Sequence, residues 1–210
     1  MTGTAPQSPH GRFPGFDVLA QSGHWDPVTS GVVLSRLGMA PGLRFFSPAE
    51  QAVATALCDQ LLDQQGQAKV PVVSMIDTRL AEKQTDGWHY QDMPEDSQAW
   101  RGTLAALDSD AQDRYGTRFA ACTHEQQRTL IQAVQDLGAD AWHGLPAKQV
   151  WSLWTRYACT AFYSHPSAWN EIGFPGPAYP RGYKNPGVDA REPFEVRDAQ
   201  PGADPARGQQ

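Results

Sequence analysis

Apolar residues recur through the middle of the chain every three or four positions, the spacing of an amphipathic α-helix. Val53, Leu57 and Leu61 form one such stripe, and it follows Ser47 and Glu50, a capping box that can bind first-turn amides. Proline or a capping residue opens each of the other stripes, and glycine closes several of them. The pattern predicts six helices, over about residues 26–37, 47–61, 71–83, 94–116, 123–138 and 146–163.

No stretch alternates convincingly between apolar and polar residues, and no repeat of fixed period occurs. We therefore predict an all-α fold, a small bundle of about six helices with an extended C-terminal arm rich in proline, glycine and aromatic residues. The 210 residues are enough for one hydrophobic core. The expected parts are a flexible N-terminal segment (1–24), a helical domain (25–163), an extended aromatic arm (164–197) and a disordered tail (198–210).

The run from Trp151 to Tyr183 is the most unusual part of the sequence, because an apolar helix gives way there to closely spaced prolines and rings. Proline fixes φ and removes an amide donor, so the sequence predicts extended chain from residue 164 to 193. Such rings can enter pockets on another protein, or they can wrap the chain's own helices. The predicted partner interface comprises Trp151, Trp154, Phe162, Tyr163, His165, Pro166, Trp169, Asn170, Phe174, Pro175, Tyr179 and Tyr183.

Charge, hydropathy and cysteine content indicate which partners and which compartment to expect. The net charge is −6 and no cluster of lysine and arginine occurs, which argues against nucleic acid. No apolar run approaches the length of a membrane span and no export signal is visible, so we expect a cytoplasmic protein, or a periplasmic or extracellular one if a partner exports it. Three widely spaced cysteines are expected to be small buried residues, with one disulfide as the alternative. Glu50, Asp59, Asp63 and Asp77 are expected to be charges at helix ends and on solvent-facing sides of helices, and not metal ligands.

Motifs for catalysis, cofactors and metals are incomplete in this sequence. His124 and Glu125 begin a zinc-protease motif, but the second histidine is missing, and no glutamate is followed by histidine three positions later. GxGxxG and GxSxG also do not occur. We predict no catalytic, cofactor-binding or metal-binding residue, and the competing hypothesis is an enzyme that uses His165 or His143 beside a carboxylate.

Three segments resemble one known family. They are FFSPAEQAVATALCDQLL, VVSMIDTRL and the run from Tyr157 to Tyr183, which contains FYSHP followed by IGFPGPAYPRGY. Over about residues 43–183 the chain is similar to subunit 3 of gluconate 2-dehydrogenase, a family of small subunits of sugar dehydrogenases. The FYSHP and IGFPGPAYPRGY elements are the most specific part of this resemblance.

The resemblance implies a non-catalytic helical subunit bound to a large flavoprotein of the glucose-methanol-choline (GMC) family. That partner would carry FAD and oxidise a sugar, a sugar acid or another alcohol, while this chain stabilises or matures it, either as a lasting subunit or as a dissociating chaperone. Two features depart from the family. The twin-arginine signal is missing, since Arg12 stands alone in the first 35 residues, and His165 replaces an acidic residue before the proline.

Overall fold

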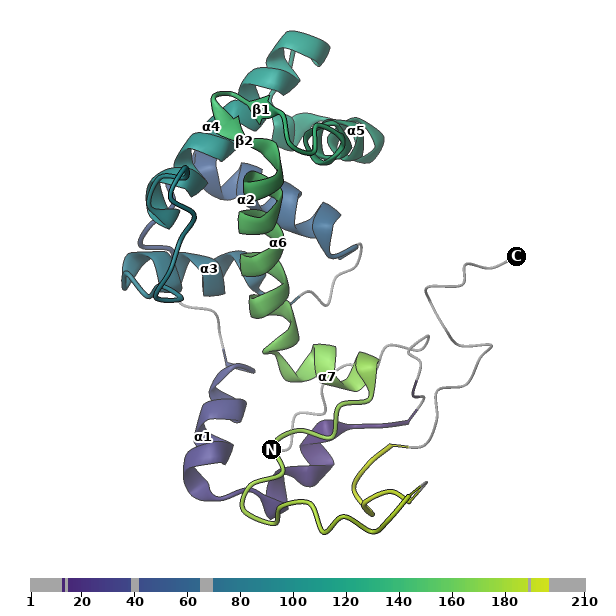
Figure 1. Ribbon diagram of the computed structural model, residues 1–210. Coiled ribbons are helices and arrows are strands. Elements are labelled where there is room, and N and C mark those ends of the chain that lie inside the picture. The colour runs from purple at the N-terminus through teal and green to yellow at the C-terminus, as the bar shows by residue number, and fades with distance from the viewer. Residues whose placement is uncertain (1–12, 14, 39–41, 65–69, 189, 197–210) are drawn as a thin grey trace, which may run out of the picture. The chain divides into compact units, whose positions relative to one another are not determined.

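Helices dominate the computed structural model, and the predicted all-α fold is confirmed (Figure 1). The structure describes residues 13, 15–38, 42–64, 70–188 and 190–196. All six predicted helices are present: α1 (Pro27–Ser35), α2 (Pro48–Leu61), α3 (Val72–Ala81), α4 (Asp96–Tyr115), α5 (His124–Asp136) and α6 (Ala147–Tyr163). The further elements are 3-10 helices at Val18–His24 and Phe119–Ala121, strands β1 (Ala141–Trp142) and β2 (Leu145–Pro146), and helix α7 (Pro166–Ile172).

Capping residues set the helix starts as the sequence predicts. The Ser47 hydroxyl accepts from the Glu50 amide at 3.3 Å, and the Glu50 carboxylate accepts from the Ser47 amide at 2.8 Å. Thr123 and Gln126 form the same reciprocal pair at the start of α5. These bonds satisfy amides that have no partner inside the helix, so the two strongest local signals in the sequence fix two helix ends.

The chain divides into two units, Ala40–Phe162 and the combination of Met1–Met39 with Tyr163–Gln210. We call the first the bundle unit and the second the terminal unit, and each is described separately. The terminal unit therefore joins the two ends of the sequence. The predicted tail at 198–210 lies outside the described residues, as do residues 1–12 of the predicted flexible segment.

Helix α2 lies at the centre of the bundle unit, in contact with α3, α4 and α5. Its Leu57 is fully buried, as are Trp100 and Leu107 of α4. Helix α6 is joined to α4 by a buried ring, because the Trp154 indole donates to the Thr103 hydroxyl at 3.0 Å. Burying such a ring stabilises the fold by up to about 3 kcal/mol. The buried residues of these helices form the core of the bundle unit.

Asp77 on α3 has a structural role that its sequence position does not reveal. The predicted solvent-facing charge is wrong here, because Asp77 is 1% exposed. Its carboxylate accepts from the amides of Arg44, Phe45 and Phe46 at 2.7 to 2.9 Å. Three amide donors offset the cost of burying a carboxylate, and they hold the segment before α2 against α3.

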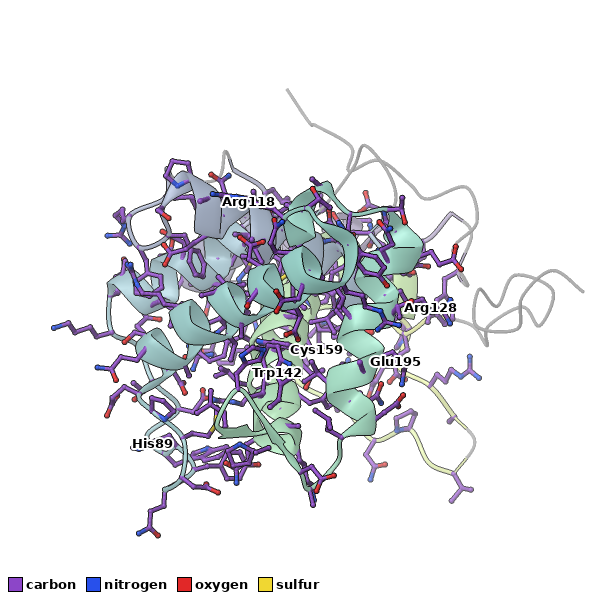
Figure 2. All side chains as sticks on the ribbon, turned by 90° about the horizontal axis from the view of Figure 1, so that it is seen from above. His89, Arg118, Arg128, Trp142, Cys159 and Glu195 are labelled. Atoms are coloured by element: carbon purple, nitrogen blue, oxygen red, sulfur yellow. The ribbon has the colours of Figure 1, made fainter. Side chains whose placement is uncertain are left out.

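The cysteines are free thiols, and burial raises the pKa of each. Cys58 and Cys122 are buried, as predicted. Cys159 on α6, labelled in Figure 2, is exposed, so the prediction is wrong for that residue. Helical periodicity explains the difference, because Cys159 follows the buried Ala158 and points away from the face that α6 packs into the core.

The terminal unit has a small core made by residues from both ends of the sequence. Val18, Trp25, Val33 and Trp169 pack together, with Phe16 and Leu19 at the edge. Val18 lies in the 3-10 helix, Val33 in α1 and Trp169 in α7, so these three elements meet at one cluster. The part of the predicted flexible N-terminal segment that the structure describes contains this 3-10 helix.

Candidate partner-binding surface

Helix α7 shows that the prediction of extended chain throughout residues 164–193 is wrong at Pro166–Ile172. Pro166 occupies the first turn, where its missing amide costs nothing, and the next proline comes only at 175. The His165 Nδ1 atom accepts from the Ser167 amide at 3.2 Å and caps the helix. Gly173 ends the helix in the left-handed conformation, with φ of 71°. The FYSHP element thus starts a two-turn helix.

His165 is a buried structural imidazole rather than a free base. It is 7% exposed, and burial lowers its pKa, although a hydrogen bond to the Arg36 backbone acts in the opposite direction. The Arg36 side chain donates to the Ser164 carbonyl at 2.6 Å and adds a nearby positive charge. A neutral ring suits this site, because the Nδ1 atom must keep its lone pair to accept from Ser167.

The chain that follows α7 packs against other parts of the terminal unit. Phe174 packs edge-on against Trp169, with ring centroids 5.3 Å apart. Gly176 lies so close to Trp25 that an added Cβ would be 2.7 Å from the indole. Further along, the buried Glu192 carboxylate accepts from the amides of Lys184 and Asn185. The arm therefore has an inner face that packs on its own chain.

Several large side chains of the terminal unit, most of them rings, are exposed. Tyr163 is 49% exposed and Phe174 38%, while Tyr179 and Tyr183 are 65% and 57% exposed, and the neighbouring Ile172 is 45% exposed. We call these five residues the aromatic surface. Among the described residues, ten of the twelve exposed large hydrophobic side chains belong to the terminal unit. Such a concentration is typical of a surface that another protein covers.

The structure separates the twelve predicted interface residues into different groups. Four of them, Tyr163, Phe174, Tyr179 and Tyr183, belong to the aromatic surface. Five more support it from inside the terminal unit, with Asn170 half-buried and the others buried: His165, Pro166, Trp169, Asn170 and Pro175. The other three lie in the bundle unit, where Trp154 is fully buried and Trp151 and Phe162 pack, partly exposed, against the core.

His143, the other histidine of the competing enzyme hypothesis, stands in the β1–β2 hairpin. Its Nε2 atom is 2.6 Å from an Asp110 oxygen, and the Trp142 indole (Figure 2) donates to the second oxygen at 2.8 Å. Asp110 thus fastens the hairpin to α4. No group of three or more His, Cys, Asp and Glu in the described part of the chain could hold a metal ion.

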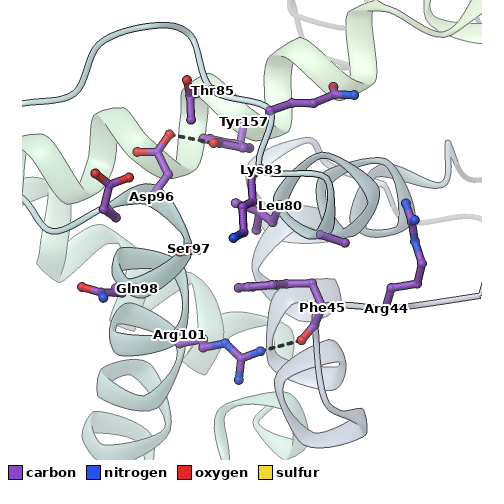
Figure 3. A pocket seen from close by; sticks show the side chains of 13 residues that line it. Arg44, Phe45, Leu80, Lys83, Thr85, Asp96, Ser97, Gln98, Arg101 and Tyr157 are labelled. Atoms are coloured by element: carbon purple, nitrogen blue, oxygen red, sulfur yellow. Dashed lines mark hydrogen bonds between the residues drawn. The ribbon is translucent and has the colours of Figure 1, made fainter.

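A cavity of about 610 Å³ opens in the bundle unit between the ends of α3 and α4 (Figure 3). The Tyr157 hydroxyl donates to Asp96 at 2.6 Å, and the Arg101 guanidinium donates to the Phe45 carbonyl at 2.7 Å. Burial and the bond to Asp96 raise the pKa of Tyr157, so the hydroxyl stays protonated. None of the predicted site residues lines this cavity.

An ion-pair network beside the cavity was not predicted. Asp86 accepts from both Arg79 and Arg156, and although burial opposes it, these bonds lower the pKa of the Asp86 carboxyl. Arg156 also lies over the Trp88 ring, 5.1 Å from its centroid. The network fixes the exposed loop that carries His89 (Figure 2). Arg156 is 70 positions from Asp86 in the sequence, so residue spacing could not reveal this network.

A family comparison agrees with the resemblance. The sequence model of gluconate 2-dehydrogenase subunit 3 matches residues 48–176, which is more than half of the chain. The chain belongs to the gluconate 2-dehydrogenase subunit 3 family. For this subunit 3 protein, no curated protein and no solved structure gives a significant match.

Membership of the subunit 3 family implies a hetero-oligomeric complex with a catalytic subunit. The match covers α2 to α7 and ends at Gly176, the residue that packs on Trp25. Helix α1, Tyr179 and Tyr183 lie outside it. Within the described residues, no helix of this subunit 3 protein is long and apolar enough to cross a membrane.

Proposed function

We propose that this protein is a non-catalytic small subunit that binds, and thereby stabilises or matures, an FAD-dependent oxidoreductase of the GMC family. The partner oxidises a sugar, a sugar acid or another alcohol. The observation that carries this proposal is the aromatic surface, five exposed apolar side chains of a unit that has its own core. Family membership supports the existence of a catalytic partner.

The physical basis is preorganisation. Phe174 is held edge-on against Trp169, and the backbone after Tyr183 is fixed by Glu192, so the rings next to these anchors lose little entropy on binding. Tyrosine suits such a surface, because it offers a large apolar face and a hydroxyl that can bond to the partner. A protein that binds only the folded flavoprotein raises the apparent stability of that flavoprotein by mass action.

Under this proposal FAD belongs to the partner and the chemistry takes place there. The two histidines of the competing hypothesis have structural neighbours in this chain: His165 caps α7 and His143 pairs with Asp110. These structural roles explain the positions of both histidines, and neither role requires a catalytic function.

Co-expression with a GMC flavoprotein from the same organism, followed by gel filtration and titration, tests the proposal. We expect the two chains to elute together and to confer a higher melting temperature on the flavoprotein. Tyr179→Ala with Tyr183→Ala is expected to weaken the complex by about 2 kcal/mol or more, roughly 30-fold in Kd. The matched control is Trp88→Ala with Tyr90→Ala, since these exposed rings lie in the bundle unit.

Two results discriminate further. A chain that stays apart from every candidate flavoprotein, with or without FAD, contradicts the proposal. A complex that forms only with the FAD-free flavoprotein and dissociates when FAD is added indicates a maturation chaperone rather than a lasting subunit.

A further inference from the structure

Helix α1 is a short helix that exposes several apolar side chains to solvent. Val28 is 76% exposed, Val32 51% and Leu34 44%, and Leu37 just beyond the helix is 36% exposed. Only Val33 of this helix is buried. A surface helix normally carries charged or polar residues on its outer face, so α1 has the opposite of the expected pattern.

The exposed residues form one continuous face. At 100° per residue Val28 and Val32 lie one turn apart on the same side, Gly31 and then Leu34 extend this arc, and Val33 lies on the opposite side. An added Cβ at Gly31 would meet nothing within 4 Å, which leaves the helix backbone open to close approach. From residue 27 to 38 the only charged side chain is Arg36, which is half-buried.

This face contributes nothing evident to the stability of the chain itself. Valine and glycine are weak helix formers, and exposed valines gain no burial energy in the free protein. The helix is instead held from outside its exposed face. Asp26 caps it by accepting from the Thr29 amide at 2.6 Å, and Val33 anchors it in the core shared with Trp169.

Its position is fixed beside the aromatic surface. Arg36 donates to the Ser164 carbonyl at 2.6 Å, and its guanidinium lies 6.0 Å from the centroid of the Trp169 ring. Ser164 directly follows Tyr163, one of the exposed rings. The end of α1 and the start of the aromatic surface are therefore adjacent parts of the same unit.

We propose that the outer face of α1 is a second docking element for the catalytic subunit, inserted into an uncharged apolar groove of that subunit. The inference rests on the proposed function and adds which further residues bind and what the partner must present. Three observations favour this occupant: the family has a catalytic partner, α1 ends beside the residue that follows Tyr163 of the aromatic surface, and the helix carries no exposed cation for anionic lipid headgroups.

The test is Val28→Asp with Val32→Asp, compared with the double alanine variant at Trp88 and Tyr90 and with the wild-type chain. Both valines are more than half exposed, so circular dichroism and melting temperature of the free variant are expected to match the wild type. Titration against the flavoprotein is expected to show a Kd at least 30-fold higher for the aspartate variant and unchanged for the control. Hydrogen exchange of α1 amides is expected to slow only in the complex.

Several results overturn the inference. If the aspartate variant binds like the wild type while the tyrosine variants bind weakly, α1 is not a docking element and the proposed function stands. If the wild-type chain binds no flavoprotein, both proposals fail. If sedimentation shows a dimer of the free chain that the aspartate variant dissolves, with flavoprotein binding unchanged, the occupant is a second copy. If the variant unfolds, Val28→Ser with Val32→Ser replaces it, and unchanged binding again overturns the inference.

Discussion

The side-chain oxygen of Asn170 accepts a hydrogen bond from the backbone amide of Val18 at 2.7 Å, across 152 positions of sequence. Val18 is fully buried, so its amide has no access to water. The bond ties the N-terminal 3-10 helix to α7 and makes the two ends of the described chain one structure. The candidate interface therefore rests on residues that no local segment could supply alone.

Asn170→Ala is expected to destabilise the terminal unit by about 1–3 kcal/mol, because the buried Val18 amide would lose its partner. Urea unfolding of the free chain, followed by tryptophan fluorescence, measures this change. The control is Glu171→Ala at the neighbouring exposed position. Equal unfolding midpoints for the two variants would contradict the role assigned to Asn170.

Gly176→Ala is expected to destabilise the same unit for two reasons. The residue has φ of +80°, and the added Cβ would lie 2.7 Å from Trp25 and 3.0 Å from Val18. Gly182→Ala is the matched control, since Gly182 has φ of +67° and open space around it. Both variants share the backbone strain, so overpacking is expected to cost Gly176→Ala about 1–3 kcal/mol more in the free energy of unfolding. A difference near zero would show that the ring of Trp25 moves aside freely.

Stability of the terminal unit is expected to fall with pH below about 6.5. Burial lowers the pKa of His165 below its ordinary value of 6.5. As the pH falls, this histidine is therefore protonated at a higher pH in the unfolded chain than in the folded chain, which favours unfolding. The stabilisation is complete above pH 6.5 and decreases as the pH falls from there toward the folded pKa.

His165→Asn preserves a capping side chain but removes the titration. Denaturant midpoints between pH 5 and 8 are expected to depend less on pH in this variant than in the wild type. His24→Asn, at an exposed position, serves as the control and is expected to keep the wild-type slope. Parallel slopes for all three proteins would rule out His165 as the origin.

Trp154→Ala is expected to cost about 3–5 kcal/mol in the unfolding free energy of the bundle unit, because the ring is fully buried and bonded to Thr103. Trp151→Ala, at a half-buried position on the same helix, is expected to cost less. Thermal unfolding followed by circular dichroism compares them. Equal losses would mean that the two rings contribute alike to the core.

Local sequence signals determined the bundle helices well. Ser47 with Glu50 and Thr123 with Gln126 form capping boxes from residues only three positions apart, so nothing distant is needed to specify these helix starts. The same reasoning failed at Pro166, where the number of prolines suggested extended chain. One proline in the first turn is compatible with a helix, and the cap came from His165, which is not a common capping residue.

The sequence by itself determined the all-α fold, the six predicted helices, the family and the presence of a region rich in aromatic residues, because each depends on spacing or motifs within short segments. Only the tertiary structure decided which rings of that region face outward. Trp169 and Tyr179 are equally plausible anchors in the sequence, yet one packs on Val18 and Trp25 from the other end of the chain while the other stays exposed. Burial depends on contacts between distant segments, and periodicity within one segment cannot report it.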